Sequence, residues 1–123
     1  MLSAVDKPRV SSAATLSGYL VRSRRHEDLG CIEELMVDSS SGRIVYAILS
    51  FGGSLGNNGK LYAVPWSALN LDTDQRAFFL DLERAQLEAA PKFDEENWPD
   101  FADLEWMDRV HRHYGLRSQT LAA

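Results

Sequence analysis

The segment that most constrains the fold runs from residue 29 to residue 66 and contains three apolar runs separated by two turn sequences. The runs cover residues 30–38, 43–51 and 60–64. Short runs rich in β-branched and aromatic residues, with glycine-containing turns between them, are typical of neighbouring antiparallel strands. The segment therefore predicts a β-meander. Its turns hold mainly Ser, Gly and Asn and show no catalytic motif.

The middle run, residues 43–51, reads R-I-V-Y-A-I-L-S-F, so seven of its nine residues are apolar. A strand with one face in water alternates apolar and polar residues, whereas this run barely alternates. We therefore expect both faces of the strand to be covered. One face would fill the interior of the sheet, and the other would meet a helix or a second subunit.

The remaining elements are placed by their local patterns. We expect a flexible N-terminal tail over residues 1–14, a strand at 16–21, a charged loop at 22–28 and a helical turn at 66–69. Further elements are a strand at 77–82, a short helix at 83–90, a final helix opening at Pro99 and Asp100 and ending at Gly115, and a tail at 117–123. Residues 15–90 would form the barrel domain, and residues 91–116 a helical extension packed on the barrel or on a partner.

Two local irregularities are also expected. Interrupted alternation predicts a β-bulge near Glu33 and Glu34. Residues 38–42 predict a turn in which Asp38 bonds the backbone ahead and Gly42 adopts a positive φ. The glycine-rich stretch at residues 52–59 lacks the spacing of a phosphate-binding loop, so it predicts a hairpin tip.

Length and composition favour one soluble domain. The chain has 123 residues and no apolar run long enough to cross a bilayer. Cys31 is the single cysteine and is expected to be a small buried residue in a reducing compartment. Asp6 and Pro8 stand where a signal peptide would be apolar, which predicts a cytoplasmic protein.

The net charge of −5 is unevenly distributed. Residues 70–123 hold twelve acidic and six basic residues, which argues against nucleic-acid binding through this half because the surface would repel phosphates. The one basic cluster is Arg22, Arg24 and Arg25, and it is followed at once by Glu27 and Asp28. A solvated loop is favoured over a phosphate site there.

Several residues together carry a resemblance to a known family: Gly30, Ile32 and Asp38; residues 42–46 and 51–53; Lys60; Val64, Pro65, Trp66 and Leu69; residues 90–93; and Trp98, Tyr114 and Gly115. In order and spacing the chain resembles the PRC-barrel family, named after the cytoplasmic domain of the photosynthetic reaction-centre H subunit, and looks like its small stand-alone bacterial members. The resemblance implies a mainly β fold, a small antiparallel barrel of about six strands with a C-terminal helical segment. It also implies a domain that serves as a module in unrelated settings, including a ribosome maturation factor.

Other polar residues give weak chemical signals. His111 and His113 lie about 200° apart on the predicted helix, so they cannot share a metal ion and are expected on its surface. The carboxylates between Asp94 and Asp108 could form a cation site or a proton relay, but helix capping and solubility explain them as well. Ser39, in a run of three serines, is expected to be a turn residue rather than a nucleophile, because no nucleophile motif surrounds it. No cofactor or metal is predicted.

The aromatic residues after residue 90 are the candidate partner-binding residues: Phe93, Trp98, Trp106 and Tyr114. Trp106 lies off the apolar stripe of the predicted helix, and Trp98 precedes that helix. These tryptophans would either complete the core of one subunit or anchor an interface, where Trp and Tyr are enriched.

The function that follows is a non-catalytic interaction or scaffold module that self-associates, expected as a homodimer, and that could also bind another protein. One alternative is a small-molecule- or cation-binding barrel with proton-relay carboxylates like those of the H subunit. A second alternative is a ribosome-associated assembly factor using Arg22, Arg24 and Arg25.

Overall fold

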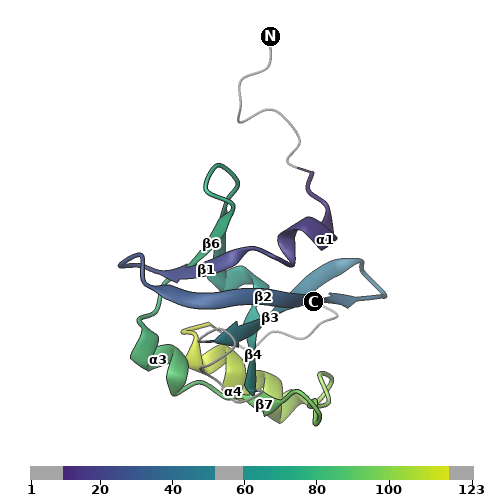
Figure 1. Cartoon of the computed structure of the whole chain (residues 1–123). Coiled ribbons are helices and arrows are strands. Elements are labelled where there is room, and N and C mark those ends of the chain that lie inside the picture. Colours follow the sequence, from purple (N-terminus) through teal and green to yellow (C-terminus); the bar gives the residue numbers. More distant parts are fainter. Residues whose placement is uncertain (1–9, 52–59, 117–123) are drawn as a thin grey trace.

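A computed structural model describes residues 10–51 and 60–116, and its centre is one seven-stranded sheet (Figure 1). The strand order is β5-β6-β1-β2-β3-β4-β7. The strands are β1 (Leu20–Ser23), β2 (Asp28–Asp38), β3 (Arg43–Phe51), β4 (Lys60–Pro65), β5 (Leu69–Asp72), β6 (Ala77–Leu80) and β7 (Phe93–Asp94). The sheet is not closed, and β5 and β7 form its two edges. The prediction of a mainly β fold with a C-terminal helix is confirmed.

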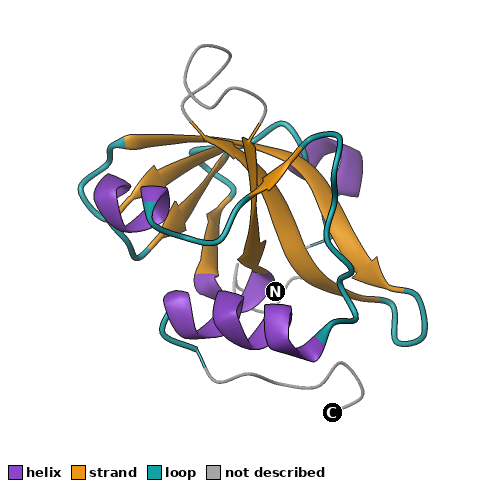
Figure 2. Ribbon diagram, turned by 90° about the horizontal axis from the view of Figure 1, so that it is seen from below, coloured by secondary structure: helices purple, strands orange, loops and turns teal. Residues whose placement is uncertain are grey.

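One strand pair departs from the expected antiparallel arrangement. β1 and β6 pair in parallel, from Leu20 opposite Ala77 to Ser23 opposite Leu80, whereas all other neighbours are antiparallel. Parallel neighbours need a long connection between them, and here the whole β2–β5 segment provides it. Figure 2 shows from below that the strands of the sheet curl. The buried side chains form one core cluster.

The central hairpin of β2 and β3 has the predicted details. The register shifts between Ile32 and Glu34, which confirms the bulge. Asp38 accepts hydrogen bonds from the Ser40 amide and from the Ser41 hydroxyl, both at 3.0 Å. Gly42 has φ of +77°, a conformation that costs a glycine little. The predicted hairpin tip at 52–59 lies outside the described residues.

Several elements differ from the sequence predictions. Residues 13–16 form the short helix α1 (Ala13–Leu16), so the first strand begins at Leu20 rather than at residue 16. The short strands β5 and β7 were not predicted, because four and two residues are too few to show alternation. β7 lies within residues 91–116, and its Phe93 pairs with Leu61 of β4.

The helices follow the predicted sequence order. A single 3₁₀ turn, η2 (Trp66–Ala68), follows β4, and α3 (Arg84–Glu88) follows β6. The last helix, α4 (Leu104–His113), begins four residues after the predicted opener, Asp100. Asp100 instead accepts the Ala102 amide in a separate turn at 2.9 Å, and the Asp103 carboxylate caps the helix by accepting the Glu105 amide at 3.0 Å.

The core explains why β3 is apolar on both faces. Tyr46, Ala47, Ile48 and Leu49 are each at most 1 % exposed. Tyr46 faces residues of the last helical segment, with its ring 5.5 Å from that of Trp106 and 5.9 Å from that of Phe101. The second face of β3 is therefore covered by the chain's own helix, and Figure 2 shows α4 lying across one end of the curled sheet. Among the described helices, none is long and apolar enough to cross a membrane.

Candidate functional site

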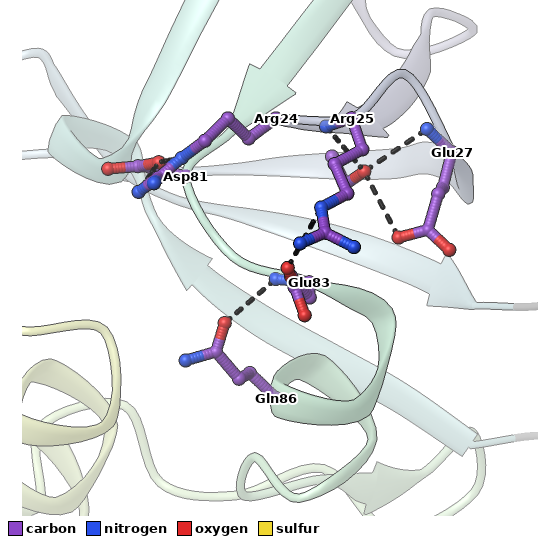
Figure 3. A network of polar contacts seen from close by, with 7 residues as sticks. Arg24, Arg25, Glu27, Asp81, Glu83 and Gln86 are labelled. Atoms are coloured by element: carbon purple, nitrogen blue, oxygen red, sulfur yellow. Dashed lines mark hydrogen bonds and ion pairs between the residues drawn. The ribbon is translucent and has the colours of Figure 1, made fainter.

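The basic loop of the sequence lies at a polar junction, defined here as Arg24, Arg25, Asp81, Glu83 and Gln86 (Figure 3). The turn between β1 and β2 meets the start of α3 there. Arg24, Asp81, Leu82, Glu83 and Gln86 line an open cavity of about 340 Å³.

A local hydrogen-bond network fixes the shape of the arginine-bearing turn. The buried hydroxyl of Ser23 accepts the amide hydrogens of Arg25 and Glu27, both at 3.1 Å, and donates to the Glu27 carboxylate at 3.3 Å. His26 takes a positive φ of 63° and packs edge-on against Phe79 at 5.5 Å. The turn is therefore held in one conformation by its own polar groups.

Each arginine of the cluster has an acidic partner. Arg24 pairs with Asp81, Arg25 with Glu83 at 3.1 Å and Arg22 with Asp28 at 3.4 Å. Such exposed pairs each contribute about 0.2–1 kcal/mol, so their main effect is to neutralise the surface. From the sequence, Glu27 and Asp28 were the expected acidic neighbours of the cluster, and Asp28 does pair with Arg22. Asp81 and Glu83 were not expected because they come from a distant part of the chain.

Glu83 and Gln86 were missed as members of this junction. The Glu83 amide donates to the side-chain oxygen of Gln86 at 2.9 Å, which stabilises the first turn of α3. An acidic residue followed three positions later by Gln is a capping pattern that could have indicated their pairing. His113 of α4 then donates from Nε2 to the backbone oxygen of Gln86 at 2.6 Å, since a carbonyl oxygen can only accept.

The two helix histidines do not share a site. His111 is 8 % exposed and its Nδ1 donates to the Met107 oxygen at 2.7 Å, so the prediction that it lies on the surface is wrong. It packs beneath Tyr46, with 5.7 Å between the ring centroids. His113 bonds α3 instead, which confirms that the two side chains point to different neighbours.

The carboxylates between Asp94 and Asp108 are dispersed among ion pairs and backbone hydrogen bonds. No group of three or more His, Cys, Asp or Glu residues in the described part of the chain is arranged to hold a metal ion. Asp94 pairs with Lys60, and Asp108 pairs with Arg112 at 2.8 Å. Asp100 and Asp103 accept backbone amides, as described above.

Cys31 is partly buried rather than fully buried as predicted. Burial raises the pKa of its thiol, and the nearby Glu33 carboxylate raises it further. A raised pKa reduces the thiolate fraction, which is the reactive form. The Cys31 thiol is therefore less reactive than a solvent-exposed thiol with an ordinary pKa.

The four predicted partner-binding residues divide into two groups. Phe93, Trp106 and Tyr114 are 8–9 % exposed and belong to the core cluster. Trp98 is 37 % exposed. The packing of Trp106 against Tyr46 and Phe101 places it in the core of one subunit.

Trp98 belongs to an aromatic corner, defined here as Phe93, Trp98 and Phe101. Its ring centroid is 5.1 Å from that of Phe93 and 6.1 Å from that of Phe101. The indole N–H of Trp98 donates to the backbone carbonyl oxygen of Glu95 at 2.7 Å. The ring is thus held in place by the chain, while 37 % of the residue remains accessible.

Two buried tyrosine hydroxyls lie near the helical segment. Those of Tyr46 and Tyr114 have no hydrogen-bond partner among the described residues. Burial raises the pKa of Tyr46 to about 12, and it raises the pKa of Tyr114 as well, with a smaller contribution from Tyr62. Both hydroxyls are therefore protonated and uncharged at neutral pH.

The open, curled sheet with its capping helix defines a small β-barrel-like domain. Comparison with known protein families matches residues 8–87 to the PRC-barrel domain, and the chain belongs to this family. No curated protein matches the chain in sequence. The match ends within α3, so the aromatic corner and α4 lie beyond it.

Proposed function

We propose that this chain is a non-catalytic protein-interaction module whose contact surface is the aromatic corner. The observation that carries the proposal is the position of Trp98, 37 % exposed yet packed at an angle against Phe93 and Phe101. Tryptophan is among the residues that contribute most to protein interfaces. Membership in the PRC-barrel family, a module that occurs in unrelated settings, also supports a non-catalytic role.

The contacts of Trp98 suit it to binding. Its indole N–H already donates to the backbone oxygen of Glu95, so a partner need not supply a hydrogen-bond acceptor. The rings of Phe93 and Phe101, packed against Trp98, limit its rotamers, and a side chain ordered in advance loses little conformational entropy on association. Trp66 and Trp106 are more buried, since Trp66 packs on Phe78 and Trp106 is 8 % exposed.

Site-specific photo-crosslinking in cells tests this assignment. A benzophenone amino acid replaces Trp98 in one variant and Leu71 in a control, because Leu71 is also 37 % exposed but lies on β5. We expect discrete adducts from position 98 and none of the same mass from position 71. Equal labelling from both positions would remove the aromatic corner as the contact surface.

Self-association as a homodimer is a second candidate, favoured by apolar side chains outside the aromatic corner. Val37 on β2 is 53 % exposed and Leu20 on β1 is 43 % exposed. Light scattering at tens of micromolar tests it, with a mass of twice 13.8 kDa expected. Val37→Glu should then shift the mass towards the monomer, and a monomeric wild type would exclude the homodimer.

Ribosome or RNA association and cation binding have weaker support from the described residues. A ribosome- or RNA-associated role needs free cationic groups, whereas Arg24 and Arg25 are each paired with a carboxylate. A cation-binding or proton-relay role needs clustered ligands, and the described carboxylates are dispersed among caps and ion pairs. A reducing compartment such as the cytoplasm is the proposed setting, since Cys31 has no second cysteine to pair with.

A further inference from the structure

The aromatic corner lies in the most acidic part of the chain. Residues 93–105 read F-D-E-E-N-W-P-D-F-A-D-L-E, with six carboxylates and no Lys, Arg or His. Trp98 and Phe101 both lie inside this stretch. Any partner that covers Trp98 therefore meets the carboxylates of residues 93–105, which are called the negative rim here.

Half of these carboxylates are engaged within the chain. Asp94 pairs with Lys60, while Asp100 and Asp103 accept the amides of Ala102 and Glu105. The other three, Glu95, Glu96 and Glu105, are exposed and form no ion pair with a described residue. Their negative charge is available to a partner.

This charge distribution selects the chemistry of the occupant. A second copy of the chain would bring two negative rims together, because the same stretch would lie on both sides, and like charges across an interface oppose association. Nucleic acid would be repelled by the same carboxylates. A segment with an apolar side chain flanked by Lys or Arg suits this surface. Its apolar side chain can pack on the exposed indole, and its basic side chains can pair with the carboxylates of the rim.

We propose that the aromatic corner docks a basic, apolar segment of another protein, with the partner's apolar side chain on Trp98 and its Lys or Arg side chains on Glu95 and Glu96. This inference rests on the proposed function and adds the class of partner. The aromatic contact supplies affinity, and the charges supply orientation and discrimination against acidic partners.

A pair of synthetic peptides tests the proposal directly. One carries lysine and leucine in an amphipathic pattern, and the other carries glutamate in place of every lysine. Binding is followed by the NMR signal of the Trp98 indole N–H, assigned with a Trp98→Phe variant. We expect binding of the lysine peptide only, with an affinity that falls as salt rises from about 0.05 to about 0.5 M because salt screens exposed charges.

The chain offers a matched control for the location of the charges. Glu95→Gln with Glu96→Gln removes two exposed carboxylates at the aromatic corner, and Glu33→Gln with Glu34→Gln removes two from β2. We expect the first pair of substitutions to weaken binding about fivefold and the second to weaken it less than about twofold. Trp98→Ala should weaken it about tenfold or more.

The outcomes separate this inference from the proposed function. Equal weakening by the two glutamine pairs would mean general charge attraction and would overturn the docking site. No binding of the lysine peptide, or equal binding of the glutamate peptide, would overturn the basic partner. If discrete adducts still form from position 98 in the crosslinking experiment, the interaction module stands with a partner of different chemistry, and adducts of dimer mass would identify a second copy.

Discussion

Trp106 lies edge-on against Tyr46, with 5.5 Å between the ring centroids, and this contact joins the last helix to the central strand. Tyr46 is 1 % exposed and Trp106 is 8 % exposed. Edge-to-face aromatic packing of this kind adds to the free energy of burial. The contact therefore makes α4 part of the domain core.

The two tryptophans of the helical segment should differ in their effect on stability. Trp106→Ala opens a cavity beneath Tyr46 and should lower the free energy of unfolding by about 3–5 kcal/mol. Trp98→Ala, at a side chain that is 37 % exposed, should lower it by about 1 kcal/mol. Urea denaturation of both variants measures the difference. Equal losses would mean that Trp98 is as much a core residue as Trp106.

The bond from His113 Nε2 to the Gln86 oxygen, at 2.6 Å, should stabilise the packing of α4 on α3. His113→Ala removes the donor, and we expect a loss of about 1 kcal/mol, the usual size for one hydrogen bond. Hydrogen exchange of the α3 amides should become faster. Arg109→Ala, an exposed change on the same helix, is the control and should leave exchange in α3 unchanged.

Stability should fall steeply in alkali because of the buried tyrosines. The pKa of Tyr46 is raised to about 12 in the folded chain, against about 10 in the unfolded chain. Between these values the unfolded state binds fewer protons than the folded state, so the free energy of unfolding decreases as the pH rises from about 10 to about 12. Denaturant titrations across this range measure it, and Tyr46→Phe should flatten the decrease. An unchanged slope in Tyr46→Phe would contradict the assignment.

Removing the acidic partners of Arg24 and Arg25 should create a cationic surface that binds polyanions. Asp81→Asn with Glu83→Gln frees Arg24 and Arg25, so elution from a heparin column should require more salt. Glu33→Gln with Glu34→Gln changes the net charge equally at another place and is the control. If both variants elute together, net charge rather than the freed arginines is responsible.

Local patterns were sufficient for most elements of the fold. The apolar run at residues 43–51 and the turn at 38–42 were placed correctly because strand propensity and turn chemistry act over a few residues. β7 was not predicted, because its two residues form a strand only through their pairing with β4. The parallel pairing of β1 with β6 likewise depends on residues more than 50 positions apart, with Leu20 opposite Ala77.

The candidate site shows the same division. The aromatic residues and the acidic stretch after residue 90 are visible in the sequence, yet the sequence left open whether Trp98 and Trp106 belong to the core or to an interface. His111 was expected on the surface because polar side chains usually are, whereas packing beneath Tyr46 buries it.

The sequence by itself determined the strand-forming runs, the turns and the acidic character of the C-terminal half, because these depend on side-chain type and short-range geometry. Only the tertiary structure decided that Trp106 is covered by Tyr46 and Phe101, that Trp98 keeps an accessible face and that Arg25 is paired with Glu83. Burial and ion pairing are set by which distant segments meet, and the hydrophobic effect selects those meetings over the whole chain rather than within any one window.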